Sequence, residues 1–174
     1  MSDYNEDSIR SLQWNVHLRE RPGMYIGKLG DGSEPDDGIY VLLKEVIDNS
    51  IDEFMRGYGR NIEVTIKDSQ VSVRDYGRGM PLGKVIDCVA RINTGGKFDD
   101  QAYDTAIGMN GVGVKAVNAL STMFFVSSVV NGKKKSARFS AGEIVEDFPI
   151  CETDEHNGTF ISFLPDDKLF ENFH

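Results

Sequence analysis

An acidic segment in the first third of the chain carries the side chains best suited to chemistry. Glu45, Asp48, Asn49 and Asp52 are three or four residues apart, so on a helix they form one polar column. A carboxylate one turn from an amide oxygen suits a magnesium-bound nucleotide, because Mg²⁺ prefers oxygen ligands, keeps several waters and takes few groups from the protein. Glu45 is then free to act as a general base. The alternative is a solvated acidic face of an amphipathic helix.

Three glycine clusters follow this segment and favour the nucleotide interpretation. They are Asp75-Tyr76-Gly77-Arg78-Gly79-Met80-Pro81, Thr94-Gly95-Gly96-Lys97-Phe98 and Gly108-Met109-Asn110-Gly111-Val112-Gly113-Val114. The last cluster leads into a predicted helix, whose free backbone N–H groups can meet a triphosphate. A flexible surface loop before a helix is the alternative for this cluster.

Two common phosphate-binding motifs do not account for these glycines. Gly111-Val112-Gly113-Val114-Lys115-Ala116 fits the loose dinucleotide pattern, but that fold needs a strand directly before the motif, and a polar loop stands there. A P-loop requires Gly-Lys followed by Ser or Thr, four residues after another Gly, and the chain has no such run. Phosphate binding must therefore be built differently.

The functions of Asp75 and Thr159 depend on how the chain folds. Asp75 ends a predicted strand at the first glycine turn, where its carboxylate can accept a hydrogen bond from a ligand amine such as adenine N6. It can equally cap the turn. Thr159 opens the last predicted strand, and it is an ordinary strand residue unless its hydroxyl reaches the same pocket.

Helical patterns predict the elements that position these residues. A polar arm over residues 1 to 10 precedes a short helix from Ser11 to Glu20. The acidic column lies on a long helix that begins near Asp37, a candidate N-cap, and stops at Gly57. Two more helices are expected, from Lys84 to Asn93 and from Val114 to Ser121. The apolar stripe of the long helix consists of Ile39, Leu42, Leu43, Val46, Ile47, Ile51 and Phe54.

Alternating patterns predict the strands. Asn61 to Lys67 and Gln70 to Asp75 read as a hairpin, and Asn131-Gly132 predicts a second tight hairpin. The other expected strands are Met123 to Val130, Ser136 to Ser140, Ile144 to Phe148 and Thr159 to Leu164. The predicted class is α/β (α+β), a two-layer sandwich in which helices cover one face of a mixed, mostly antiparallel sheet.

Composition narrows the function classes. A chain of 174 residues with 40% hydrophobic content fills one core, so we expect a single domain over residues 1 to 174. A net charge of -9 makes it a poor binder of duplex DNA by itself. The cysteines, Cys88 and Cys151, do not have the spacing of a metal site. The same is true of the three histidines, His17, His156 and His174. With no apolar run of membrane-span length, we expect the reducing cytoplasm and no membrane partner.

Taken in order, Glu45-x-x-x-Asn49, Asp75-x-Gly77-x-Gly79 and Gly108-x-x-Gly111-x-Gly113 resemble the three motifs of the GHKL ATPase superfamily, which has the Bergerat fold. Four segments of the sequence resemble the B subunits of bacterial type IIA topoisomerases, namely DNA gyrase and topoisomerase IV. These segments are Arg21-Pro22-Gly23-Met24-Tyr25-Ile26-Gly27, Glu45 to Glu53, Gly95-Gly96-Lys97-Phe98-Asp99 and Gly111 to Ser121. The match covers nearly the whole chain and leaves the choice between the two enzymes open.

The resemblance implies specific roles. Glu45 would polarise the attacking water, Asn49 would ligate Mg²⁺, and Asp75 would read adenine directly and through a water shared with Thr159. Gly77, Gly79, Met80 and Pro81 would line the site. The segment Gly108, Met109, Asn110, Gly111, Val112, Gly113 and Val114 would wrap the ATP phosphates, and Lys97 and Tyr103 would contact nucleotide from a lid over about 94 to 113. Tyr4, on an exchanged arm, would reach the nucleotide of a second copy of the chain.

Two departures from the family pattern bear on the site. Many relatives carry a His one turn before the catalytic Glu, whereas Tyr40 and Val41 stand there, so the group that orients Glu45 is open. Relatives also insert a longer loop after the position of Pro81, so the pocket rim should be shorter here.

The resemblance also implies partners and limits. The full enzyme would act with an A-type subunit and DNA, and ATP binding would dimerise two B subunits. The chain has no counterpart of the transducer and DNA-cleavage regions, so we expect an isolated ATPase domain that is monomeric and hydrolyses ATP very slowly. Another GHKL clamp or chaperone and a non-hydrolysing ATP sensor are the alternatives.

Overall fold

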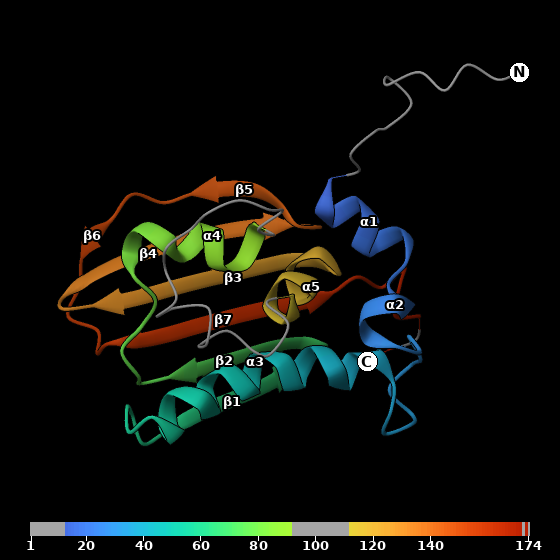
Figure 1. The fold of residues 1–174 in the computed structure, drawn as a ribbon, viewed down its shortest axis with the longest axis horizontal. Coiled ribbons are helices and arrows are strands. Elements are labelled where there is room, and N and C mark those ends of the chain that lie inside the picture. The colour runs from blue at the N-terminus through green and yellow to red at the C-terminus, as the bar shows by residue number, and fades with distance from the viewer. Residues whose placement is uncertain (1–12, 92–111, 172, 174) are drawn as a thin grey trace, which may run out of the picture.

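A seven-stranded sheet forms one layer of the protein, and helices cover one of its faces (Figure 1). The computed structural model describes residues 13–91, 112–171 and 173. The expected arm and all of the expected lid before residue 112 lie outside these residues. Strand order is β1-β2-β7-β3-β4-β5, with β6 paired to β4, and each of these pairs is antiparallel. The predicted two-layer class is confirmed.

The predicted strands form with small changes at their ends. The structure has β1 (Ile62–Lys67), β2 (Gln70–Asp75), β3 (Ser121–Val130), β4 (Lys133–Ser140), β5 (Glu143–Asp147), β6 (Cys151–Glu152) and β7 (Gly158–Pro165). Asn131 and Gly132 have φ values of 50° and 76°, as a tight hairpin turn requires. The two-residue strand β6 was not predicted, because two residues show no alternation.

The helices are α1 (Trp14–Glu20), α2 (Gly23–Ile26), α3 (Gly38–Met55), α4 (Val85–Ala90) and α5 (Gly113–Ala119), with a 3₁₀ turn, η2 (Leu82–Lys84), before α4. The turn η2 starts directly after Pro81. Helix α2 was not predicted, because Pro22 and Gly23 read as helix breakers. Pro22 stands at the N-cap of this helix, where its missing N–H costs no hydrogen bond. No helix among the described residues is long and apolar enough to cross a membrane.

Asp37 stands at the N-cap of α3, as predicted. Its side chain makes no capping hydrogen bond. Instead, Asp37 Oδ2 accepts hydrogen bonds from the backbone N–H groups of Gly32 (2.9 Å) and Glu34 (3.2 Å), and Lys28 Nζ lies 3.0 Å from Oδ1. The carboxylate therefore organises the loop before the helix, because several N–H donors of that loop converge on it.

The apolar stripe of α3 is buried only along the first part of the helix. Ile39, Leu42 and Val46 belong to the core, and Leu43 and Ile47 pack partly against it. Ile51 and Phe54 were predicted to be buried, but they are 40% and 50% exposed. They lie toward the sheet edge, where β1 is the last strand and also leaves apolar side chains exposed.

Helix α5 lies at the centre of the helical layer. It contacts α3, α4 and α1, and every residue from Val114 to Ala119 is buried. Leu18 and Trp14 of α1 pack on Ala116 and Ala119. Helix α5 therefore begins at Gly113 and is packed between the other helices.

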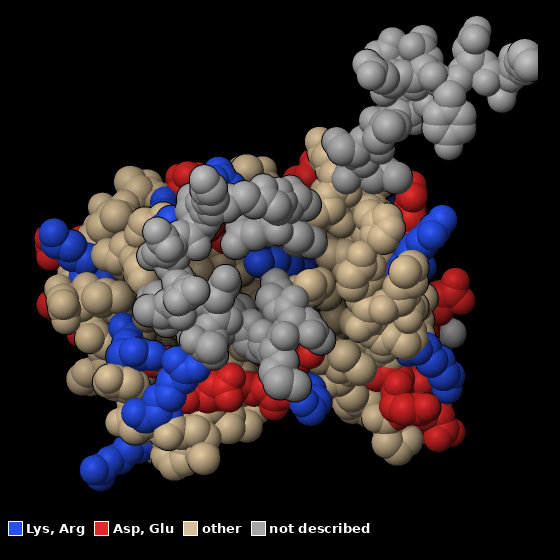
Figure 2. Space-filling model, in the orientation of Figure 1, with Lys and Arg blue, Asp and Glu red and all other residues tan. Residues whose placement is uncertain are grey.

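The basic run Lys133-Lys134-Lys135 does not create a basic surface. Lys134 pairs with Glu155 (2.5 Å) and Lys135 pairs with Asp147. Figure 2 shows acidic and basic side chains interspersed over the visible face rather than gathered into one basic patch.

Candidate functional site

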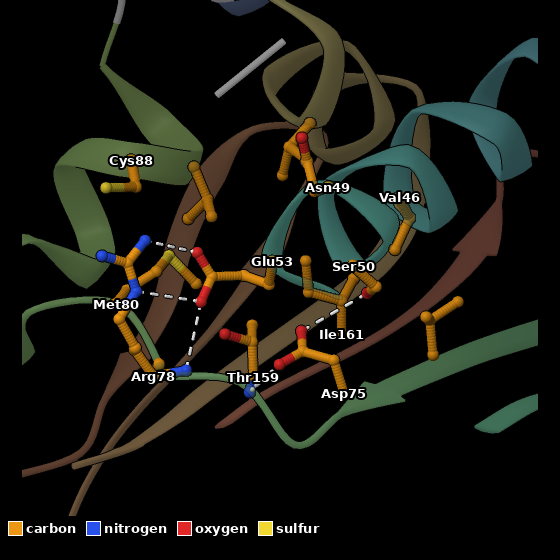
Figure 3. Close-up of a pocket in the computed structure, with 14 residues that line it drawn as sticks. Val46, Asn49, Ser50, Glu53, Asp75, Arg78, Met80, Cys88, Thr159 and Ile161 are labelled. Carbon is orange, nitrogen blue, oxygen red and sulfur yellow. Dashed lines mark hydrogen bonds and ion pairs between the residues drawn. The ribbon is translucent and has the colours of Figure 1, made fainter. Parts of the chain in front are cut away.

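A pocket opens between α3, α4, the ends of β2 and β7, and the turn after Asp75 (Figure 3). The space inside it is about 810 Å³ when the open solvent at its mouth is included. Its lining is Val46, Asn49, Ser50, Glu53, Val73, Asp75, Arg78, Gly79, Met80, Cys88, Val89, Val114, Thr159 and Ile161. Six of these residues are apolar, six have polar or charged side chains, and the other two are Gly79 and Cys88.

Asp75 is the buried polar anchor of this pocket, with 6% of its surface exposed. Its Oδ1 accepts hydrogen bonds from the backbone N–H groups of Gly77 (2.9 Å) and Thr159 (3.2 Å), and Ser50 Oγ donates to Oδ2 at 3.3 Å. Burial raises the pKa of this carboxyl, and the three hydrogen bonds oppose that shift. The result is a fixed acceptor that faces an apolar slot (Figure 3).

Gly158 allows β7 to lie tightly against the backbone of Asp75. Its φ is +139°, and a Cβ at this position would overlap the carbonyl oxygen of Asp75. Because L side chains rarely adopt this φ, glycine is needed here. The close approach places Thr159 beside Asp75, which the sequence left open.

The polar column predicted on α3 is split in the structure. Asn49 lines the pocket, and Glu45 lies beside Gly113 of α5, so close that a Cβ on this glycine would overlap the Glu45 carboxylate. Asp48 instead forms an ion pair with Lys44 on the exposed side. Asp52 is not part of the pocket lining. Positions 45, 48, 49 and 52 do share one side of the helix, but the elements packed around that side give them different neighbours.

The carboxylate of Glu45 has no side-chain hydrogen bond or ion pair with the described residues. Tyr40 does not replace the His of the relatives, since its hydroxyl donates to the carbonyl of Gly32 at 2.8 Å. Val41 packs against the core. The nearest constraint on Glu45 is therefore steric, and it comes from Gly113.

An ion pair at the pocket mouth was not predicted from the sequence. Arg78 donates to Glu53 from its backbone N (3.1 Å to Oε2), its Nε (3.2 Å to Oε2) and its Nη2 (2.7 Å to Oε1). Burial raises the pKa of Glu53, but the hydrogen bonds from Arg78 lower it more, so the net pKa is below its usual value. The Arg78 guanidinium also lies 4.2 Å from the ring centroid of Tyr58.

Residue spacing in the sequence does indicate part of this ion pair. Glu53 follows Asn49 by one helical turn and so shares its face, and Arg78 stands inside the first glycine cluster. Ser50 and Cys88 gave no comparable signal. Cys88 is partly buried in the pocket wall, and burial raises the pKa of its thiol.

The structure brings most of the described candidate residues together. Asn49, Asp75, Gly79, Met80, Val114 and Thr159 line one pocket, and Gly77 donates to Asp75. Pro81 and Val112 are outside the lining, at the starts of η2 and α5. Tyr4, Lys97, Tyr103, Gly108, Met109, Asn110 and Gly111 lie outside the described residues.

The donors and acceptors of the pocket fit an adenine nucleotide. An aliphatic slot with one buried carboxylate accepts a flat heterocycle that carries an amino group. The described residues hold no group of three or more His, Cys, Asp or Glu side chains that could bind a metal alone. The amide oxygen of Asn49 suits Mg²⁺ when phosphate oxygens and waters supply the other ligands.

Comparisons with known proteins agree with this geometry. Residues 34–168 match the family model of histidine kinase-, DNA gyrase B- and HSP90-like ATPases. The chain is 52% identical over 171 residues to the B subunit of DNA topoisomerase 4 from Borreliella burgdorferi, covering 98% of this chain and 28% of the relative. It is 38% identical over 185 residues to the B subunit of DNA gyrase from Rickettsia conorii, covering 98% and 22%.

A solved structure has the same fold. It is the 43K ATPase domain of Thermus thermophilus gyrase B in complex with an aminocoumarin, with a TM-score of 0.71 and 34% identity. The similarity covers 96% of this chain and 43% of that one. The chain spans about a quarter of the length of the two curated relatives. Since the family model covers most of the chain, and its pocket has the features described above, the protein belongs to the family of histidine kinase-, DNA gyrase B- and HSP90-like ATPases.

Proposed function

We propose that this domain binds ATP in the pocket around Asp75 and serves as the nucleotide-operated part of the B subunit of a type IIA topoisomerase. The observation that carries the proposal is the buried Asp75 carboxylate, held by Gly77, Thr159 and Ser50 at the side of an aliphatic slot. The adenine amino group donates to this carboxylate. A water that contacts the adenine is shared by the Asp75 carboxylate and the Thr159 hydroxyl.

The phosphates extend toward the start of α5. Val114 lines the pocket and Gly113 lies beside Glu45, so the chain leading into α5 reaches both the nucleotide and the general base. In this proposal the phosphate loop is completed by Gly108, Met109, Asn110, Gly111 and Val112. Lys97 and Tyr103 also contact the nucleotide, as does Tyr4 on the arm of a second copy. Asn49 would hold Mg²⁺ through its amide oxygen, and the ion would supply neutralisation of the phosphate charge.

Glu45 acts as the general base. Its carboxylate takes the proton of the water that attacks the γ-phosphorus, while the bond to the ADP oxygen breaks. The absence of a side chain at Gly113 leaves space that the Glu45 carboxylate occupies. Positioning of this kind is a large part of catalysis in phosphoryl transfer.

In the longer protein, ATP binding dimerises two B subunits around DNA and drives strand passage with an A-type subunit, in the cytoplasm. This proposal is supported by the topoisomerase IV and gyrase relatives. Residues 1 to 174 alone are monomeric and turn ATP over very slowly in this proposal, because the cation that the resemblance places on the γ-phosphate belongs to the transducer region.

Calorimetric titration tests the binding proposal. The wild-type domain and Asp75→Asn are titrated with a non-hydrolysable ATP analogue, with and without Mg²⁺. We expect wild-type binding that Mg²⁺ strengthens and that Asp75→Asn weakens by about tenfold or more, since the amide presents a donor where the adenine amino group needs an acceptor. Equal affinity in both proteins contradicts the assignment of Asp75.

Substitution of the base separates an ATPase from a non-hydrolysing sensor. In the full-length protein, Glu45→Ala should leave analogue affinity nearly unchanged and abolish hydrolysis. A comparable loss of affinity would assign Glu45 to binding. DNA-dependent turnover by the full-length wild type distinguishes the topoisomerase from another GHKL clamp or chaperone, the second candidate.

A further inference from the structure

Tyr58 lies at the pocket mouth but is not among the residues that line the pocket. It follows α3 by three residues, and its backbone N–H donates to the carbonyl of Glu53 at 3.0 Å. The glycines on either side, Gly57 and Gly59, have φ values of +89° and +75°. A Cβ on Gly59 would lie 2.8 Å from the carbonyl oxygen of Tyr76, so this turn lies tightly against the chain that carries the glycine cluster. The turn thus places the Tyr58 ring next to Arg78.

The guanidinium of Arg78 is restrained on two sides. Glu53 receives a two-point hydrogen bond from Nε and Nη2, which makes the guanidinium nearly coplanar with the carboxylate. The Tyr58 ring lies 4.2 Å from the guanidinium carbon. Figure 3 shows Arg78 and Glu53 side by side at the pocket, and both belong to its lining.

We propose that Tyr58 is a positioning residue for ligand binding: together with Glu53 it holds the Arg78 guanidinium as a flat cationic surface against which the planar base of a bound nucleotide packs. The inference rests on the proposed function and extends it to a residue outside the pocket. Guanidinium groups stack on planar rings, and a preoriented group loses less conformational entropy on binding. The Arg78 side chain is 46% exposed, so without Tyr58 it would sample other rotamers.

The effect should be specific for ligands that carry a base. Titration with a non-hydrolysable ATP analogue should show an affinity weaker by roughly threefold to fivefold for Tyr58→Leu, the size of an exposed cation–π contact. Tyr58→Phe keeps the ring, so it should bind within about twofold of the wild type. Inorganic tripolyphosphate has no base, and its affinity should be the same in all three proteins.

Two further variants distinguish positioning from a general structural effect. In an Arg78→Gln background, Tyr58→Leu should cause no additional loss, because the group that it positions is absent. Tyr40→Leu is a matched control, since Tyr40 is similarly exposed at 43% and hydrogen-bonds to Gly32 instead. This control should bind the analogue like the wild type.

Two results would overturn the inference. An equal loss from Tyr58→Leu with and without Arg78, or a loss in Tyr58→Phe as large as in Tyr58→Leu, would show that the stacked pair does not position the ligand. Failure of the proposed function has a different signature, because the wild-type domain would then not bind the analogue at all.

Discussion

Gly113 lies so close to Glu45 that any side chain at position 113 would overlap the carboxylate. The two residues come from different helices, α5 and α3, which pack directly against each other. Glu45, the proposed general base, therefore lies where α3 and α5 pack together, and no side chain among the described residues is hydrogen-bonded to its carboxylate.

Gly113→Ala tests this relationship. The added methyl group must displace the Glu45 carboxylate, and a displacement of about 1 Å can reduce the rate of a positioned reaction on the order of 100-fold. Nucleotide affinity should change much less. Single-turnover hydrolysis and calorimetry measure the two effects separately, with Gly83→Ala as the control because a Cβ there meets nothing within 4 Å. Unchanged hydrolysis would show that Glu45 is not the base.

Asp75→Asn should stabilise the ligand-free domain at neutral pH while it weakens nucleotide binding. Burial raises the pKa of Asp75, so the folded state binds its proton more tightly than the unfolded chain, whose Asp pKa is about 3.9. The free energy of unfolding therefore falls as the pH rises through the interval between these two pKa values. Asparagine does not titrate and avoids this loss.

Thermal unfolding of both proteins at increasing pH, starting below the unfolded Asp pKa of about 3.9, measures the effect. The midpoint of Asp75→Asn relative to the wild type should increase as the pH rises. A difference that is constant with pH would mean that the carboxyl titrates alike in the folded and unfolded states.

Gly158→Ala should destabilise the fold by more than about 2 kcal/mol, because it combines a strained φ with overlap of the Asp75 carbonyl. Chemical denaturation measures the free energy of unfolding. Gly83→Ala is again the matched control, and its effect should stay within about 0.5 kcal/mol. A small effect at Gly158 would mean that β7 can move away from β2 at this point without cost.

Arg19→Gln should cost about 2 kcal/mol of unfolding free energy, because it leaves the buried carboxylate of Asp166 without its cation. Arg19 Nη1 also donates to the carbonyl of Ala119 at 3.0 Å, at the end of α5. Arg91→Gln removes an exposed ion pair with Asp87, and it should cost less than about 0.5 kcal/mol in the same denaturation experiment.

The pH dependence of Arg19→Gln provides a second check. Burial raises the pKa of Asp166, but the hydrogen bonds from Arg19 and the backbone outweigh it, so the net pKa is below its usual value. The pair therefore stabilises the fold above the unfolded pKa of about 3.9, and this contribution is lost as the pH falls through the folded pKa. The difference between wild type and Arg19→Gln should shrink in acid.

The sequence by itself determined most of the helices and strands, although not α2 and β6, and it indicated a nucleotide as the ligand. Alternation from Asn61 to Asp75 specifies the β1–β2 hairpin, and the helix from Gly38 to Met55 follows from its periodic apolar residues. Local chemistry also placed Asp75 at the end of a strand and the glycines next to it. These features depend on residues close in the chain, so they can be read without knowing the fold.

Only the tertiary structure decided which side chains meet. Asp75 reaches Thr159 because the glycine at 158 allows β7 to approach β2, and Ser50 joins them from α3. The exposure of Ile51 and Phe54, the loop-binding function of Asp37 and the contact between Glu45 and Gly113 were likewise decided by distant neighbours. The physical reason is that burial and side-chain contacts depend on how elements far apart in the sequence pack, which periodicity within one element does not specify.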